Sequence, residues 1–459
     1  MRGMGGDRSN RLWKVAGTSL SIELPVDKLL HELARQGRKG AAARDFVYDS
    51  EPVRQTLMLD LMNGEDPLRE DEAGIKLADA VAAGTVCLTS LSLVQAGLSE
   101  AGARALALAL PARPTLTRLD LTGNRRMGST GTADLTAAAL RRESSVEYLS
   151  LYDTCLGPAG AKAVAKLLRE NQTITHLDLS TNAIGKDGTD EIAAALDDPW
   201  GAVQTYEASR KKAHEVGGQS DLADKDLKHP PQNASIKRLE LGNNLIGDGG
   251  CQALASMLLH NVHLTYLDLY ANGITHVGAD ELCSGLSSNA ALCSLGLEDD
   301  PIGERGAKAL ASMLRTNKTL RSLSVFGREI GEGGVIALSF ALRETNSTLT
   351  RLDLSSWQLR QDPTPMPDSD RPRKFGERGV KALAAVLAHN TGLQHLNIEG
   401  NGCGDAGARA LISSLAHNRT LLSLGGLCDE NELTSQCKAE VDMALLVHRR
   451  QIKTSYGAL

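Results

Sequence analysis

The sequence predicts an α/β solenoid, a stack of short repeats that each contain one strand and one helix. Three consecutive segments begin at Ile236, Leu264 and Leu292, so the pattern returns every 28 residues. Each segment opens with alternating leucines, as at Leu239 and Leu241, and ends in a run rich in alanine and leucine. Alternation of period two is typical of a strand, and apolar residues three and four apart are typical of a helix. A fixed period of this length predicts stacked repeats.

Each repeat has one strand face and one helix face that must be buried. Leu239 and Leu241 are expected to point inward from the strand. The helix that follows carries an apolar stripe formed by Leu254, Met257 and Leu258. Since one repeat cannot cover either face alone, neighbouring repeats supply the core.

Two kinds of residue mark the corner between strand and helix. A polar residue at the ninth position is expected to hydrogen-bond backbone groups where the strand turns away, and in the central repeats this residue is Asn244, Asn272 or Asp300. Glycine permits tight backbone turns. We therefore expect the chain to turn into its helices at Gly249, Gly278 and Gly306.

The repeat frame extends in both directions. Further repeats begin at Leu88, Leu116, Val146, Ile174, Leu320, Leu349, Leu393 and Leu421. With a degenerate first repeat around Leu59 and Leu61, this gives about 11–12 repeats over residues 56–430. Residues 1–55 are expected to form an N-terminal extension or cap, and residues 431–459 a C-terminal cap helix and tail. The last layer should be shielded by Leu433, Val441, Leu445 and Leu446.

Two spacings exceed the period and place insertions near residues 198–235 and 359–374. Long insertions in compact domains are often functional, so both are candidate binding loops, and the alternative is tolerated surface decoration. In the N-terminal extension, residues 25–38 are expected to form an amphipathic helix. This helix would either cover the first repeat or dock on another subunit.

The frame recurs clearly outside the central repeats. One copy reads Ile174, Leu177, Leu179, Asn182 and Ile184, and another reads Leu393, Leu396, Ile398, Asn401 and Gly407. This pattern resembles the ribonuclease-inhibitor-like class of leucine-rich repeats. The resemblance implies a horseshoe with a parallel sheet on the concave face and helices outside. Members of this class include inhibitor proteins, the sensing ends of NOD-like receptors, Ran GTPase-activating proteins and ciliary scaffold subunits, so several functions stay open.

Composition excludes several classes of protein. The chain has 459 residues and a net charge of −6, which argues against a general nucleic-acid binder with a basic stripe. It has no run of eighteen apolar residues, so no membrane span is expected. Its eight cysteines form no Cys-x-x-Cys pair and are expected to be free, mostly buried thiols in a reducing, cytoplasmic compartment. Five Asn-x-Ser/Thr sequences fall just before a repeat begins, so the repeat pattern explains them.

No catalytic or metal-binding constellation stands out. The chain has no Gly-x-x-x-x-Gly-Lys-Ser/Thr loop, and residues 185–189 are the corner of a repeat. His176 and His395 are expected to face the concave sheet, but they belong to distant repeats and predict no metal pair. We therefore expect no cofactor, no metal and no enzymatic activity.

Side chains that point outward from the strands predict where a partner binds. The fifth position of successive repeats is often acidic, and aromatic residues gather at the third and seventh positions. Aromatic residues among charges are typical of protein interfaces. The candidate partner-binding residues on the concave face are Tyr148, Tyr152, Asp178, Arg238, Tyr266, Asp268, Tyr270, Glu298, Asp299, Phe326, Arg351, Asp353 and Trp357.

The sequence thus predicts a non-enzymatic scaffold, adaptor or inhibitor. It would bind the basic or mixed surface of a protein partner through the concave face and the insertions, as a monomer or as a subunit of a larger complex. One alternative is a Ran-type GTPase-activating protein, although that family typically ends in a long acidic tail and this chain ends with Arg449, Arg450 and Lys453. Another is a structural subunit of a large assembly, such as a ciliary complex.

Overall fold

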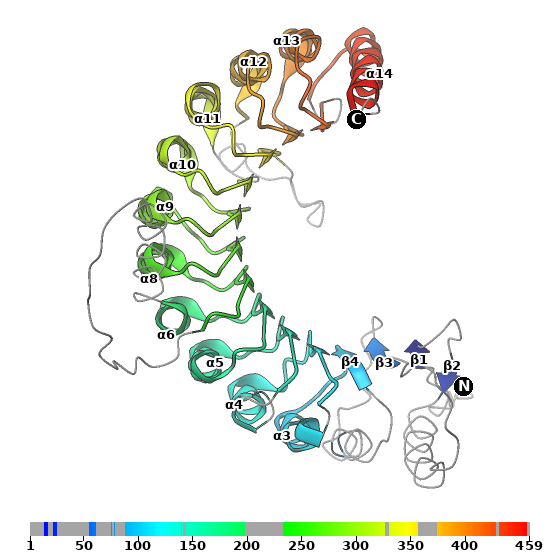
Figure 1. Ribbon diagram of the computed structural model, residues 1–459, viewed down its shortest axis with the longest axis vertical. Helices are drawn as coiled ribbons and strands as arrows, with labels where there is room; N and C mark the ends of the chain where they lie inside the picture. Colours follow the sequence, from blue (N-terminus) through cyan, green and yellow to red (C-terminus); the bar gives the residue numbers. More distant parts are fainter. Residues whose placement is uncertain are drawn as a thin grey trace, which may run out of the picture. The chain divides into compact units, whose positions relative to one another are not determined.

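The computed structural model describes residues 13–16, 22–24, 55–60, 75, 78, 88–112, 114–138, 140, 144–197, 233–325, 330–356, 374–427 and 431–456. It confirms the predicted solenoid, because short parallel strands alternate with helices along the stack (Figure 1). The chain divides into two compact units. Unit 1 consists of Met1–Leu196 and Leu227–Asn244, and unit 2 of Asp197–Asp226 and Leu245–Leu459.

Unit 1 begins the stack. Its strands are β1 (Trp13–Ala16), β2 (Ile22–Leu24), β3 (Gln55–Asp60), β4 (Leu88–Val94), β5 (Arg118–Asp120), β6 (Tyr148–Ser150), β7 (His176–Asp178) and β8 (Arg238–Glu240). Its helices are α3 (Glu100–Ala109), the 3-10 helix η1 (Leu110–Ala112), α4 (Gly128–Ala138), α5 (Gly157–Glu170) and α6 (Gly185–Leu196). From β3 to β8 the strands pair in parallel and in chain order.

Unit 2 continues the same pattern. Its strands are β9 (Tyr266–Asp268), β10 (Ser294–Gly296), β11 (Ser322–Ser324), β12 (Arg351–Asp353), β13 (His395–Asn397) and β14 (Ser423–Gly425), all paired in parallel with their neighbours. Its helices are α8 (Gly247–His260), α9 (His276–Ser288), α10 (Gly303–Thr316), α11 (Gly331–Glu344), α12 (Gly376–Leu387), α13 (Gly404–Leu415) and α14 (Ser435–Tyr456). Among the described helices of the chain, none is long and apolar enough to cross a membrane.

The core lies between the sheet and the helices, as predicted. Leu239 and Leu241 are fully buried, and so are the helix residues Leu254, Met257 and Leu258. In each unit the helices lie on one side of the sheet (Figure 1). We call the opposite side of each sheet its open face. It is formed by the residues that flank the central leucine of each strand.

The N-terminal extension contains two strands that the sequence analysis did not predict. The strand β1 pairs antiparallel with β3 and with β2, and so extends the edge of the parallel sheet. An unpaired edge strand exposes backbone N–H and C=O groups, and β1 satisfies those of β3. The predicted helix over residues 25–38 lies outside the described residues. So do the two insertions, apart from residues 233–235 and Lys374.

Asparagine at the ninth position bonds the backbone, as predicted. The side-chain amide of Asn272 donates to the carbonyl of Leu269 at 2.7 Å. That of Asn244 donates to the carbonyls of Leu179 and Leu241 at 2.9 and 3.0 Å. These buried side chains form a ladder that links each strand end to its own repeat and to the preceding one.

Asp300 stands in this ladder in place of asparagine. Its Oδ1 accepts hydrogen bonds from the backbone N–H groups of Asn272 and Ile274, both at 2.9 Å. The residue is 2% exposed, and its Oδ2 has no hydrogen-bond partner. Burial raises the pKa of Asp300 to about 8 against the opposing effect of these backbone donors, and nearby Glu298 raises it further. The carboxyl group therefore retains its proton at neutral pH.

A second asparagine ladder lies where each helix leads into the next strand. In a representative case, the amide of Asn317 donates to the carbonyl of Leu286 at 2.8 Å. Its Oδ1 accepts from the N–H groups of Thr319 and Leu320 at 3.0 and 2.8 Å. Equivalent buried positions are held by Asn171, Asn233, Asn261, Asn289, Asn346, Asn390 and Asn418. This ladder accounts for the Asn-x-Ser/Thr sequences.

The prediction for the corner glycines was wrong. Gly249, Gly278 and Gly306 lie within helices. The turns into α8 and α10 occur instead at Gly247 and Gly303, whose φ angles of 58° and 61° favour glycine. Gly278 has a packing role, because a Cβ there would lie 2.9 Å from Cγ2 of Ile274 and 3.0 Å from Sγ of Cys251.

The helix α14 covers the last repeat, but not with all the residues expected. Cys437 and Val441 are buried, whereas Leu446 is 45% exposed, so its predicted place in the shield was wrong. Leu446 lies five positions after Val441 and falls on another face of the helix. The buried position belongs to His448, whose Nε2 donates to the carbonyl of Leu421 at 2.8 Å.

Candidate functional site

The open face of unit 1 carries a row of side chains from four neighbouring strands. The strands β5 to β8 pair in register, so equivalent positions are held by Arg118, Tyr148, His176 and Arg238. Each of these residues directly precedes the inward-pointing leucine of its strand. The four side chains therefore project from the open face as one row.

Ring contacts order the first half of this row. The guanidinium carbon of Arg118 lies 3.5 Å from the centre of the Tyr148 ring, a cation–π geometry. The rings of Tyr148 and His176 meet edge to face, with 4.5 Å between centroids. Burial raises the pKa of Tyr148, so its hydroxyl keeps its proton at neutral pH. Tyr148 is thus held between two neighbours before any partner arrives.

Glu240 joins the second half of the row. Its Oε1 accepts from Nε2 of His176 at 2.9 Å and from Nε of Arg238 at 2.6 Å. Burial alone would raise the pKa of Glu240, but these two donors outweigh it and lower the pKa. The carboxylate is therefore ionised at neutral pH, and it holds both of its donors in place.

Four predicted site residues belong to unit 1. Tyr148 and Arg238 lie in the row, Asp178 lies in β7, and Tyr152 follows β6; all four are partly buried. Asp178 accepts from the hydroxyl of Ser150 at 3.3 Å, and burial raises its pKa. The structure adds three residues that the candidate set left out, namely Arg118, His176 and Glu240. A comparison of third positions across the strands could have identified the first two.

Seven predicted site residues belong to unit 2. Tyr266 and Asp268 lie in β9 and Tyr270 follows it; Glu298 and Asp299 follow β10; Arg351 and Asp353 lie in β12. The carboxylates of Asp268 and Glu298 converge over Gly296, where a Cβ would lie 2.7 Å from Oδ1 of the first and 2.6 Å from Oε2 of the second. Burial raises the pKa of Glu298 to about 7, and the charges of Asp268 and Asp353 add to this effect. Phe326 and Trp357 lie outside the described residues.

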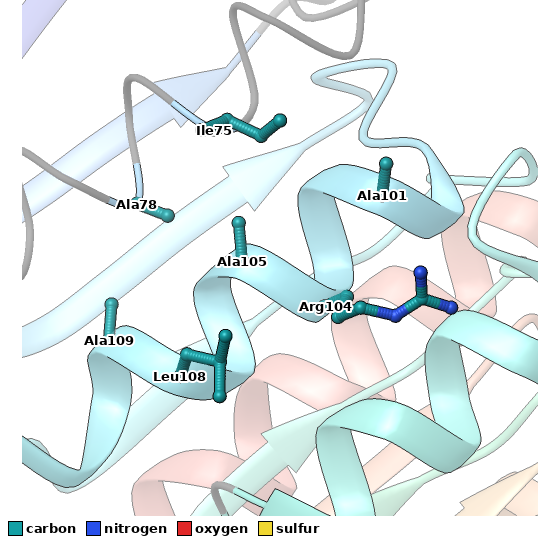
Figure 2. Close-up of a pocket in the computed structure, with 7 residues that line it drawn as sticks. All are labelled: Ile75, Ala78, Ala101, Arg104, Ala105, Leu108 and Ala109. Carbon is teal, nitrogen blue, oxygen red and sulfur yellow. The ribbon is translucent and has the colours of Figure 1, made fainter.

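A hollow of about 440 Å³ lies beside α3. Its lining is apolar apart from Arg104 and consists of Ile75, Ala78, Ala101, Arg104, Ala105, Leu108 and Ala109. Figure 2 shows the alanines of α3 on the side of Ile75 and Ala78, with the guanidinium of Arg104 directed away. Arg104 donates to Asp134 and Glu100 at 2.7 and 3.2 Å. Because the lining offers no convergent polar groups, we assign no ligand to this hollow.

The described residues offer little chemistry elsewhere. No group of three or more His, Cys, Asp or Glu side chains in this part of the chain could hold a metal ion. The described cysteines are free thiols, and burial raises the pKa of Cys251 and Cys283 far above the neutral range. Both are therefore inert, small buried residues.

Fold and site together define a solenoid in which the described helices lie on one side of the sheet and charged and aromatic side chains line the other. Comparison with known proteins agrees. A family model described as "Leucine Rich repeat" matches residues 113–133, 170–193, 232–255, 260–283 and 389–411. The chain carries leucine-rich repeats of the ribonuclease-inhibitor-like class.

Two curated relatives illustrate the likeness. Ribonuclease inhibitor of Sus scrofa is 30% identical over 184 residues, which are 40% of this chain and 39% of the relative. NACHT, LRR and PYD domains-containing protein 13 of Homo sapiens is 32% identical over 187 residues, which are 40% of this chain and 17% of the relative. The chain thus spans well under two thirds of these relatives.

Solved structures are more distant. The actin-binding site 2 of leiomodin-1 has a TM-score of 0.27 at 16% identity and covers 46% of this chain and 91% of its own. The structure of the yeast Rad7 and Elc1 complex has a TM-score of 0.32 at 16% identity and covers 90% of this chain and 91% of its own. Likenesses of this size say nothing about binding.

Proposed function

We propose that this protein is a non-enzymatic interaction scaffold that binds a protein partner through the open face of its sheet. The observation that carries the proposal is the row from Arg118 to Arg238 in unit 1. Tyrosine and arginine dominate the binding energy of many protein interfaces. Here Tyr148 is fixed by Arg118 at 3.5 Å and by the ring of His176 at 4.5 Å.

The fixed position of Tyr148 matters because binding must offset the conformational entropy that side chains lose when an interface immobilises them. Each mobile side chain that an interface immobilises costs about 0.5–1.5 kcal/mol. In the row, contacts within the protein already restrict Arg118, Tyr148, His176 and Arg238. A partner that binds this face therefore loses little affinity to the ordering of these side chains. The proposal places the same role on the open face of unit 2, around Tyr266, Tyr270 and Glu298.

The test replaces the centre of the row. We expect Tyr148→Ala to weaken binding of a partner isolated with the wild-type protein by about 2 kcal/mol or more. The matched control is Phe340→Ala, which removes a 48%-exposed aromatic side chain from the helix α11. Affinities are measured by calorimetry with purified partner, and circular dichroism checks the fold of each variant. Equal affinities for the wild type and both variants would contradict the open-face proposal.

The absence of catalysis is part of the proposal. A Ran-type GTPase activator would share the fold but would accelerate GTP hydrolysis by a small GTPase. We expect purified protein to leave the hydrolysis rates of candidate small GTPases unchanged. Acceleration that depends on residues of the open face would replace the scaffold proposal with the activator.

A further inference from the structure

Charges on the open face of unit 1, and at the carboxyl ends of its strands, lie in two layers. Among the described residues, three arginine–carboxylate pairs occur there: Arg118–Asp120, Arg125–Asp153 and Arg238–Glu240. The arginine side chains are 45%, 69% and 39% exposed, and their acidic partners are 15%, 18% and 21% exposed. In each pair the arginine side chain is thus the more exposed partner.

This layering changes what the face presents to a partner. Asp120, Asp153 and Glu240 are each paired with a more exposed arginine. Asp178, which lies among them, is partly buried, and burial raises its pKa. Although the chain has a net charge of −6, the more exposed member of each of these pairs is an arginine, and the guanidinium group of Arg118 lies beside the ring of Tyr148.

We infer that the open face of unit 1 binds an acidic segment of the partner protein, with Arg118 and Arg238 each receiving a carboxylate. This inference rests on the proposed function and specifies the partner's chemistry. A planar guanidinium group matches a carboxylate in two parallel hydrogen bonds. Nη2 of Arg118 lies 3.6 Å from Oδ2 of Asp120, too far for a hydrogen bond, so the internal pair leaves room for such a contact.

The spacing of the two arginines restricts the segment. Arg118 begins β5 and Arg238 begins β8, three strands away. Neighbouring strands lie about 4.8 Å apart, so the two positions are about 14 Å apart. An extended peptide advances about 3.3 Å per residue. Carboxylates about four residues apart in an extended segment would therefore reach both arginines.

The experiment uses the full chain and four labelled probes of equal length in fluorescence anisotropy. These are a Gly/Ser peptide with glutamates four residues apart, the same peptide with lysines, the same peptide with phosphoserines, and a single-stranded oligonucleotide. The double variant Arg118→Ala/Arg238→Ala removes the proposed contacts. Lys162→Ala/Arg169→Ala is the matched control, because both residues lie on α5 in the same unit and pair with Glu191 at 3.7 and 3.6 Å.

We expect the glutamate peptide to bind the wild type and the control alike, and to lose roughly tenfold in affinity for the arginine double variant. Equal binding to both double variants would overturn the inference. So would tighter binding of the phosphoserine peptide or the oligonucleotide. Preference for the lysine peptide, lost in Tyr148→Ala, would overturn the acidic partner but leave the open-face proposal standing. If no probe bound the wild type, the inference would fall, while binding of the isolated partner to Tyr148→Ala would still decide the open-face proposal.

Discussion

At the scale of single residues, one carboxyl group stands where the repeats otherwise use an amide. The amide of Asn272 donates to the carbonyl of Leu269, whereas the equivalent oxygen of Asp300, Oδ2, has no partner. A carboxylate oxygen cannot donate, but a protonated carboxyl group can. Asp300 therefore reproduces the ladder only in its neutral form, which its raised pKa favours at neutral pH.

The variant Asp300→Asn should stabilise unit 2 by an amount that grows with pH. The unfolded chain releases this proton near the ordinary pKa of 3.8, whereas the folded chain holds it until about pH 8. Because the folded pKa is raised, the stability from this group is present below the unfolded value and lost as pH rises through the folded value. We expect equal stability near pH 4 and a gain of roughly 5 kcal/mol at pH 8, since each unit of pKa shift corresponds to about 1.4 kcal/mol, measured by urea unfolding.

The reciprocal variant Asn272→Asp is the control for this prediction. It places a second buried carboxyl group in the same ladder, where the amide is 2% exposed. The stability of Asn272→Asp should fall as pH rises, as that of the wild type does because of Asp300. The stability of Asp300→Asn should not show this fall. Parallel pH profiles for the wild type and both variants would show that Asp300 is ionised in the folded chain.

At the scale of elements, buried asparagines join each helix to the next strand. The variant Asn317→Ala leaves the carbonyl of Leu286 and the N–H groups of Thr319 and Leu320 without their partner. Each buried unsatisfied group costs about 1–3 kcal/mol, and part of this is recovered by relaxation. We expect a loss of about 3 kcal/mol in the free energy of unfolding. The adjacent variant Lys318→Ala, whose exposed ammonium group bonds two carbonyls, should cost under about 1 kcal/mol; similar losses would refute a special role for the ladder.

Elements differ in how far the sequence predicts them. The repeat strands and helices follow from local periodicity, because each buries its apolar side against the next copy of itself. The strands β1 and β2 carry no such signal, since their pairing with β3 depends on contacts distant in sequence. The misplacement of Leu446 has another cause. Hydrophobicity favoured leucine, but the rotation of the helix from Val441 brings His448 to the core.

At the scale of the whole molecule, the candidate site could be predicted only in part. Tyr148 and Arg238 follow from the repeat frame, because third positions point outward. The contact between His176 and Glu240 joins residues 64 positions apart across an insertion, so the sequence does not show them as neighbours. The layering of arginine over carboxylate depends on side-chain conformations, which the repeat pattern does not specify. The sequence therefore predicts the acidic fifth positions, and the structure adds the arginines that pair with Asp120 and Glu240.

In a stack of repeats, each repeat is stabilised by its neighbours. A destabilising change at one end should therefore lower the stability of successive repeats by decreasing amounts. The helix α14 buries Val441 against the last repeat of unit 2, whereas Met443 on the same helix is 62% exposed. The variant Val441→Asp places a charge in this contact and should detach α14. Hydrogen exchange followed by mass spectrometry should then show the largest loss of protection in α13 and smaller losses from α12 back to α9. The matched variant Met443→Asp should leave the pattern unchanged. A uniform loss across unit 2 would mean that it unfolds as one cooperative block.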